Sequence, residues 1–82
     1  MVTEAQLKEV LGRLPVHQPV VEVDCDATRL IATVTSSSFA SLDEADRQAL
    51  VWGHLIEQLG DLALGPVEFV FTNAPGEVEA AE

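Results

Sequence analysis

The side chains that most often carry chemistry are few in this chain: one cysteine, Cys25, and two histidines, His17 and His54. A thiolate or a neutral imidazole can ligate a metal ion, and an imidazole can also transfer protons. Cys25 lies between Asp24 and Asp26, whose negative charges oppose formation of the thiolate. Cys25 is therefore the candidate metal ligand, and the alternative is an incidental turn thiol.

The spacing of these groups argues against catalysis by any of them. About six extended residues separate His17 from Cys25, a span of roughly 20 Å, so the two cannot bind one metal ion within a monomer. His54 has no second nitrogen or sulfur ligand one helical turn away. The serine run at 36–38 lacks a paired base and the glycines of a nucleophile elbow. Phosphate-loop, dinucleotide and paired-cysteine motifs are absent, and we therefore expect no enzyme.

The charge balance restricts the class of partner. The chain has 14 acidic and 4 basic side chains and a net charge of −10. Such a charge repels nucleic acids and anionic membranes, and it attracts basic proteins. No apolar run approaches the ~18 residues of a membrane span, and the first residues do not follow a signal-peptide pattern. A single cysteine forms no intrachain disulfide, so we expect a cytoplasmic protein without nucleic-acid or membrane partners.

Periodicity predicts the elements that position these groups. The capping-box pair Thr3 and Gln6 begins a helix over residues 3–14, whose apolar residues recur at spacings of three and four. Residues 20–24 and 30–35 follow the alternating or β-branched pattern of strands. They predict an antiparallel hairpin whose tight connection, four residues long, begins with the cysteine.

A long helix is predicted from Leu42 to about Gly60, after a second capping-box pair, Ser41 and Glu44. At 100° per residue, its apolar positions fall on one arc, which we assign to the core. These positions are Leu42, Ala45, Ala49, Trp52, Ile56 and Leu59, and Leu55 and Leu62 widen the arc.

The opposite face of this helix carries the candidate contacts for a protein partner. Leu50 projects among carboxylates there, and His54 lies about 160° from Trp52 around the helix. An exposed leucine can anchor a partner, although lone exposed leucines are common. We predict Arg47, Leu50 and His54 as partner contacts. A small enzyme that uses His54 with nearby carboxylates is a further alternative.

The last strand completes the predicted fold. Residues 67–72 alternate, with Phe69 on the face predicted to meet the core and Val70 on the open face. A strand-helix-strand crossover makes this strand parallel to its neighbour. Both helices have one apolar face, so both cover the same face of the sheet. We predict an α+β two-layer sandwich of order α-β-β-α-β over residues 1–73, with a three-stranded mixed sheet and a flexible acidic tail at 74–82.

The chain resembles the BolA-like proteins, which have a type II KH-like fold. The element order matches, and so does the serine stretch that ends in a phenylalanine at 36–39, with Ser41 before the long helix. The segment at 47–52, followed by Leu55, is similar to the Arg-His-Arg helix run of that family. The strand ending in Thr-x-x-Pro at 67–75 is also similar. The resemblance covers nearly the whole chain, and no single motif in it is diagnostic.

The resemblance implies a non-catalytic adaptor or regulator. BolA-like proteins bind monothiol glutaredoxins and help to ligate a [2Fe-2S] cluster, so the implied partner is a monothiol glutaredoxin. We expect no cofactor held by this chain alone, and the resemblance implies a cluster shared with the partner, with Cys25 as a ligand. The family also uses a histidine at the start of the last strand, where this chain has Pro66. The alternative is a protein-interaction module with no iron-sulfur role. We expect a monomer or a weak homodimer.

Overall fold

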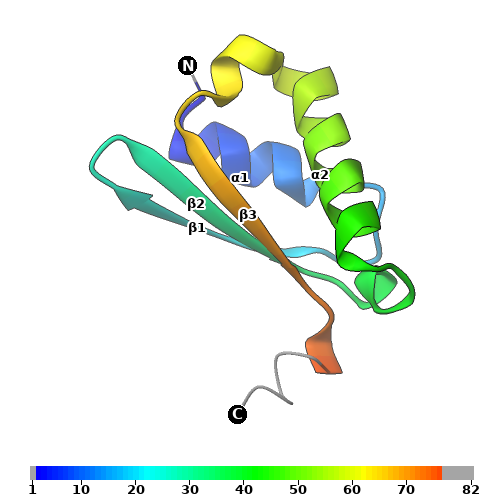
Figure 1. Ribbon diagram of the computed structural model, residues 1–82. Coiled ribbons are helices and arrows are strands. Elements are labelled where there is room, and N and C mark those ends of the chain that lie inside the picture. The colour runs from blue at the N-terminus through cyan, green and yellow to red at the C-terminus, as the bar shows by residue number, and fades with distance from the viewer. Residues whose placement is uncertain (1, 77–82) are drawn as a thin grey trace.

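The computed structural model describes residues 2–76 of the chain, and its elements follow the predicted order (Figure 1). The two helices are α1 (Glu4–Gly12) and α2 (Glu44–Leu59). The strands are β1 (Val20–Asp26), β2 (Arg29–Thr35) and β3 (Val67–Asn73), and short 3-10 helices, η1 (Ser37–Ser41) and η2 (Asp61–Leu64), flank α2. The central strand β2 pairs antiparallel with β1 and parallel with β3. The predicted α+β fold with a mixed sheet is confirmed.

The first helix begins as predicted. The Thr3 hydroxyl accepts a hydrogen bond from the Gln6 N–H at 3.2 Å, and the Gln6 side chain accepts one from the Thr3 N–H at 2.9 Å. This capping box satisfies two backbone donors at the start of α1. The helix ends at Gly12, before the predicted Leu14, although the side chain of Leu14 is still buried.

The hairpin turn is tighter than predicted. Asp26 pairs with Arg29, so the connection between β1 and β2 contains only Ala27 and Thr28. The prediction that Cys25 lies in the turn is therefore wrong, because Cys25 continues β1. Ala27 has a φ of 55°, in the left-handed region where a side chain is disfavoured.

The start of α2 also differs from the prediction. Asp43 is the N-cap, and its carboxylate accepts a hydrogen bond from the Asp46 N–H at 2.8 Å. The predicted cap, Ser41, lies in η1, where its hydroxyl donates to the Ser38 carbonyl. The extended residue Leu42 separates η1 from α2, so the predicted capping box at Ser41 is wrong.

The predicted core face of the long helix is right in part: Leu42, Trp52 and Leu59 pack against the core, and Leu55 is fully buried. The buried residues of α2 are Arg47, Val51 and Leu55, whereas Ile56, which was assigned to the core, is exposed. Ala45 and Ala49, also assigned to the core, are exposed too. The helix turns Val51 and Leu55 toward the sheet in place of Ala45 and Ala49, because valine and leucine bury more apolar area than alanine.

From Phe69 onward, the side chains of β3 point to the face of the sheet opposite to the one predicted. The register between β2 and β3 shifts at the start of β3, where Glu68 has no pairing residue in β2. Such a β-bulge breaks the alternation of faces. Val67 and Val70 are consequently both buried, and Phe69 and Phe71 lie on the open face of the sheet.

One hydrophobic core lies between the sheet and both helices, which cover the same face (Figure 1). α1, α2, β2 and β3 all contribute buried residues to it, and Phe39 of η1 is fully buried among them. Ala74, the residue after β3, is also buried. Residues 77–82 of the predicted tail lie outside the described residues.

Candidate functional site

The open face of the sheet, opposite the helices, carries three rows of side chains that cross all three strands, and a further pair, Asp26 and Arg29, at the hairpin end. Residues that pair directly across neighbouring strands point to the same face of a sheet. The register gives one residue from each strand to each row. The rows are Asp24-Ile31-Phe69, Glu22-Thr33-Phe71 and Val20-Thr35-Asn73.

Two phenylalanines dominate the β3 side of this open face. Phe69 is 39% exposed and Phe71 is 49% exposed, and their rings meet edge to face, with centroids 4.6 Å apart and an angle of 80° between the ring planes. Ile31, beside Phe69, is half-buried. Exposed aromatic groups of this kind are typical of contact surfaces. Sequence reasoning assigned them to the core, because a one-residue bulge leaves no mark in the apolar pattern.

The β1 side of the open face is acidic. Glu22 and Asp24 are both exposed. In the part of the chain from 2 to 76, neither forms an ion pair. The nearby cation Arg29 pairs with Glu68 at 3.3 Å. The open face therefore combines unneutralised carboxylates with exposed aromatic rings.

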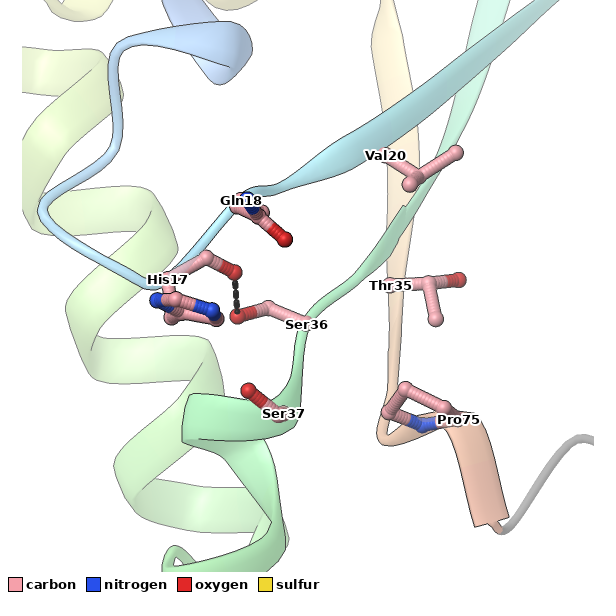
Figure 2. Close-up of a pocket in the computed structure, with 7 residues that line it drawn as sticks. All are labelled: His17, Gln18, Val20, Thr35, Ser36, Ser37 and Pro75. Atoms are coloured by element: carbon pink, nitrogen blue, oxygen red, sulfur yellow. Dashed lines mark hydrogen bonds between the residues drawn. The ribbon is translucent and has the colours of Figure 1, made fainter.

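A hollow of about 370 Å³ adjoins the third row of this face (Figure 2). It is lined by His17, Gln18, Val20, Thr35, Ser36, Ser37 and Pro75. The Ser36 hydroxyl donates to the His17 carbonyl at 2.7 Å, and the His17 N–H donates to the Ser38 hydroxyl at 2.9 Å. These serines hold the loop backbone. The described hydrogen bonds include none between the His17 ring and a serine, so the hollow lacks a nucleophile paired with a base.

Arg47, one of the predicted partner contacts, is buried. Its Nε donates to the Leu42 carbonyl at 3.0 Å and its Nη1 donates to the Thr72 carbonyl at 3.2 Å. Its guanidinium carbon lies 5.9 Å from the centre of the Phe39 ring. Arg47 therefore stabilises the junction of η1, α2 and β3 and is not part of an exposed contact surface.

The other two predicted contacts also point inward. Leu50 is partly buried and packs against the core. The Nε2 of His54 lies 2.9 Å from the Val10 carbonyl, to which it donates, because a carbonyl oxygen can only accept. The outward face assumed for both residues is wrong, since α2 is rotated relative to the prediction. His54 joins the two helices, and the idea of an enzyme built around it gains no support.

The remaining candidate, Cys25, lies at the end of the sheet where a shared cluster is implied. Cys25, Leu30 and Val67 form one row across the strands, and Cys25 is exposed. The residue before Val67 is Pro66, whose carbonyl accepts a hydrogen bond from the Leu30 N–H at 2.8 Å and whose side chain carries no donor atom. Among residues 2–76, no group of three or more His, Cys, Asp or Glu side chains could hold a metal ion.

The histidines do not complete a ligand set beside Cys25. His17 precedes β1 and so lies beyond the strand end opposite the hairpin turn, and the Nε2 of His54 is engaged by Val10. One thiol is thus the only soft donor at this end of the sheet within the described chain. The residues present do not fit a [2Fe-2S] cluster held by this chain alone.

The two helices on one face of a β1-β2-β3 mixed sheet define the class of fold, and comparison with solved structures identifies it as BolA-like. A bolA protein homologue from Coxiella burnetii superposes with a TM-score of 0.68 at 20% identity, over 96% of this chain and 99% of that one. BolA1 from Arabidopsis thaliana gives 0.60 at 20% identity, over 94% and 98%. A bol-like protein from Babesia bovis gives 0.59 at 20% identity, over 99% and 94%.

Comparisons made with the sequence, unlike those made with the structure, find no match. No protein-family model matches the chain, and no curated protein matches it. Within residues 2–76, no helix combines the length and the apolar character that crossing a membrane requires. The likeness to BolA proteins is thus a likeness of fold.

Proposed function

We propose that this chain is a non-catalytic protein-binding domain, an adaptor or regulator of the BolA type. The observation that carries the proposal is the BolA-like fold, which extends over 96% of this chain and 99% of the Coxiella homologue. A fold alone does not define a function, and the exposed aromatic and acidic face of the sheet supplies the second support. Phe69 and Phe71 leave apolar surface in water that a partner would cover.

The arrangement of the chemically capable groups supports a role without catalysis. The Nε2 of His54 is engaged by a backbone carbonyl, and the hydroxyls of Ser36 and Ser38 bond the His17 backbone. A general base must reach the proton that it removes, and neither imidazole within residues 2–76 has a nucleophile as its hydrogen-bond partner. These contacts therefore support a binding role for the chain.

A monothiol glutaredoxin is the proposed partner, because the resemblance to BolA-like proteins implies it. The test is co-elution of this protein with an apo monothiol glutaredoxin in size-exclusion chromatography, with the dissociation constant measured by calorimetry. A one-to-one complex supports the proposal. Two separate peaks and no heat of binding remove glutaredoxin as the partner.

A second candidate, a protein-binding module without an iron-sulfur role, is favoured by the ligands at the hairpin end of the sheet. Pro66 occupies the position where the resemblance implies a histidine, and Cys25 is the only soft donor nearby. Visible circular dichroism of a cluster-loaded glutaredoxin separates the two candidates. A changed spectrum on mixing, reversed by Cys25→Ser, supports cluster sharing. An unchanged spectrum supports the module without iron.

The compartment and the oligomeric state are part of the same proposal. A cytoplasmic location is consistent with a single free cysteine, which needs a reducing environment to stay a thiol. A monomer or weak homodimer is consistent with the net charge of −10, which opposes self-association. Sedimentation equilibrium at two salt concentrations measures the mass directly.

A further inference from the structure

We infer that the open face of the sheet is a docking surface for a basic amphipathic helix of a partner protein. This surface comprises the three rows described above, led by Phe69 and Phe71 on β3 and by Glu22 and Asp24 on β1. The inference rests on the proposed binding function and adds the chemistry of the partner segment.

The aromatic half of this surface favours contact with apolar side chains of a partner. Phe69 and Phe71 stay 39% and 49% exposed, whereas Phe39 is fully buried in the core. Each exposed ring forgoes the favourable burial of its apolar area. Val20, at 60% exposure, adds apolar area on the β1 edge of the same face. Leucine, methionine or aromatic side chains of a partner would recover this burial.

The acidic half requires a positive charge. Glu22 and Asp24 stand in one column of β1 without an ion pair in the described part of the chain. The cation at the hairpin end of this face, Arg29, pairs with Glu68, and Arg47 is buried with its guanidinium over the ring of Phe39. A chain with 14 acidic and 4 basic side chains steers basic partners toward such a column.

The spacing of the two halves matches the width of a helix. Neighbouring strands lie about 4.8 Å apart, so the β1 and β3 columns are roughly 10 Å apart across the sheet. An α-helix with its side chains is about 10 Å wide. A helix that lies along the strands can thus set apolar residues over Phe69 and Phe71 and lysine or arginine over Glu22 and Asp24.

The β3 edge of the sheet is closed to a partner strand. The carbonyl oxygen of Val70 accepts from Gln48 Nε2 at 2.9 Å, and that of Thr72 accepts from Arg47 Nη1 at 3.2 Å. These α2 side chains use acceptors that an added strand would need. A partner at the β3 side therefore docks on the face of the sheet and not on its edge.

The hollow extends the docking surface at one end. Val20 and Thr35 border both the open face and the hollow of about 370 Å³, and Figure 2 shows their side chains on the same side of the strands. A space of this size has room for one large side chain at the end of a docked helix. A second copy of this chain fits poorly, because it would bring a further charge of −10 to the acidic column.

The test uses a fluorescently labelled amphipathic peptide of about four helical turns, with leucine and tryptophan on one face and lysine on the other. We expect fluorescence anisotropy to show salt-sensitive binding to the full chain. A peptide with glutamate in place of lysine should not bind. The variant Phe69→Thr/Phe71→Thr, which keeps β propensity, should weaken binding at least ~10-fold. Glu22→Gln/Asp24→Asn should weaken it about threefold to tenfold.

The control variants remove carboxylates and an exposed apolar side chain outside the docking surface. Glu57→Gln/Asp61→Asn deletes two exposed carboxylates outside the docking surface, and Leu62→Ser deletes a leucine that is 95% exposed. Both should bind like the wild type. Circular dichroism confirms that every variant is folded before its affinity is compared.

Three results would overturn the inference: equal binding of the lysine and glutamate peptides, unchanged affinity of the folded phenylalanine variant, or dimerisation through this face in sedimentation experiments. The proposed function fails separately. If a glutaredoxin binds the wild type and the phenylalanine variant equally, the binding function stands and the docking surface is wrong.

Discussion

Arg47 in α2 and Thr72 in β3 are joined by a buried hydrogen bond, from Nη1 to the backbone carbonyl, of 3.2 Å. The same guanidinium donates from Nε to Leu42 and lies over the ring of Phe39. One side chain thus connects the start of the long helix, the 3-10 helix before it and the end of the last strand. The Arg47 guanidinium donates to backbone carbonyl oxygens, so Arg47 stabilises the fold.

Replacing Arg47 should therefore destabilise the protein strongly. Arg47→Ala removes charge-assisted hydrogen bonds to two carbonyls in a buried place, and we expect a loss of about 2–4 kcal/mol in the free energy of unfolding. Urea denaturation followed by circular dichroism measures it. Arg13→Ala removes a largely exposed arginine with a single i,i+4 ion pair and should cost at most about 0.5 kcal/mol. Equal losses for the two variants would contradict the structural role of Arg47.

Gln48 holds α2 against β3 through its amide. Its Nε2 donates to the Val70 carbonyl at 2.9 Å and to Glu44 at 3.1 Å, and its Oε1 accepts from the Trp52 indole at 2.9 Å. Gln48→Glu replaces the donor with a second acceptor and adds a charge beside Glu44. We expect a loss of about 1–3 kcal/mol and a shift in the fluorescence of Trp52, the only tryptophan.

The control for this prediction lies on the same helix. Gln58→Glu makes the same chemical change at an exposed position, and it should alter stability by about 0.5 kcal/mol or less without changing the tryptophan emission. A Gln48→Glu variant that behaves like Gln58→Glu would show that the amide does not join α2 to β3.

Thr72 carries a polar atom that the fold leaves unsatisfied. Its hydroxyl is buried and has no hydrogen-bond partner among the described residues. Thr72→Val has nearly the same shape and removes the hydroxyl, so we expect the protein to gain about 1 kcal/mol in stability. Thermal denaturation should show a higher midpoint, whereas Thr33→Val on the open face should change it little. A lower midpoint for Thr72→Val would indicate that the hydroxyl has a partner after all.

The hairpin turn offers a second stabilising change. Ala27 has a φ of 55°, which costs an alanine more than a glycine. Ala27→Gly should thus stabilise the protein by about 0.5–1 kcal/mol. Ala5→Gly, in the first turn of α1, should destabilise it. Urea midpoints that move in the same direction for both variants would contradict the strained turn.

The sequence predicts the order of the elements because capping boxes and strand alternation are local signals. Thr3 with Gln6 begins the first helix as predicted, and the antiparallel hairpin and parallel last strand follow the expected topology. The orientation of α2 is not local. Its alanine-rich arc and its Val51 and Leu55 arc both have helical spacing, and packing against the sheet chooses between them.

The candidate surface was harder to predict than the fold. A single bulge at Glu68 exposes Phe69 and Phe71, and such a register shift follows from pairing with β2 and not from the strand itself. Conversely, Arg47 and His54 have polar side chains and were expected outside. Both are buried or half-buried because backbone carbonyls at the ends of neighbouring elements accept their hydrogen bonds.

The most direct test of the docking surface is residue-resolved NMR with the lysine-rich amphipathic peptide and ¹⁵N-labelled protein. We predict that the largest amide shifts on titration fall on residues 20–24, 31–35 and 69–73 of the three strands. Glu57 and the rest of the exposed side of α2 should show little change. Shifts that concentrate on α2, or that spread evenly over the chain, would contradict a contact surface on the open face of the sheet.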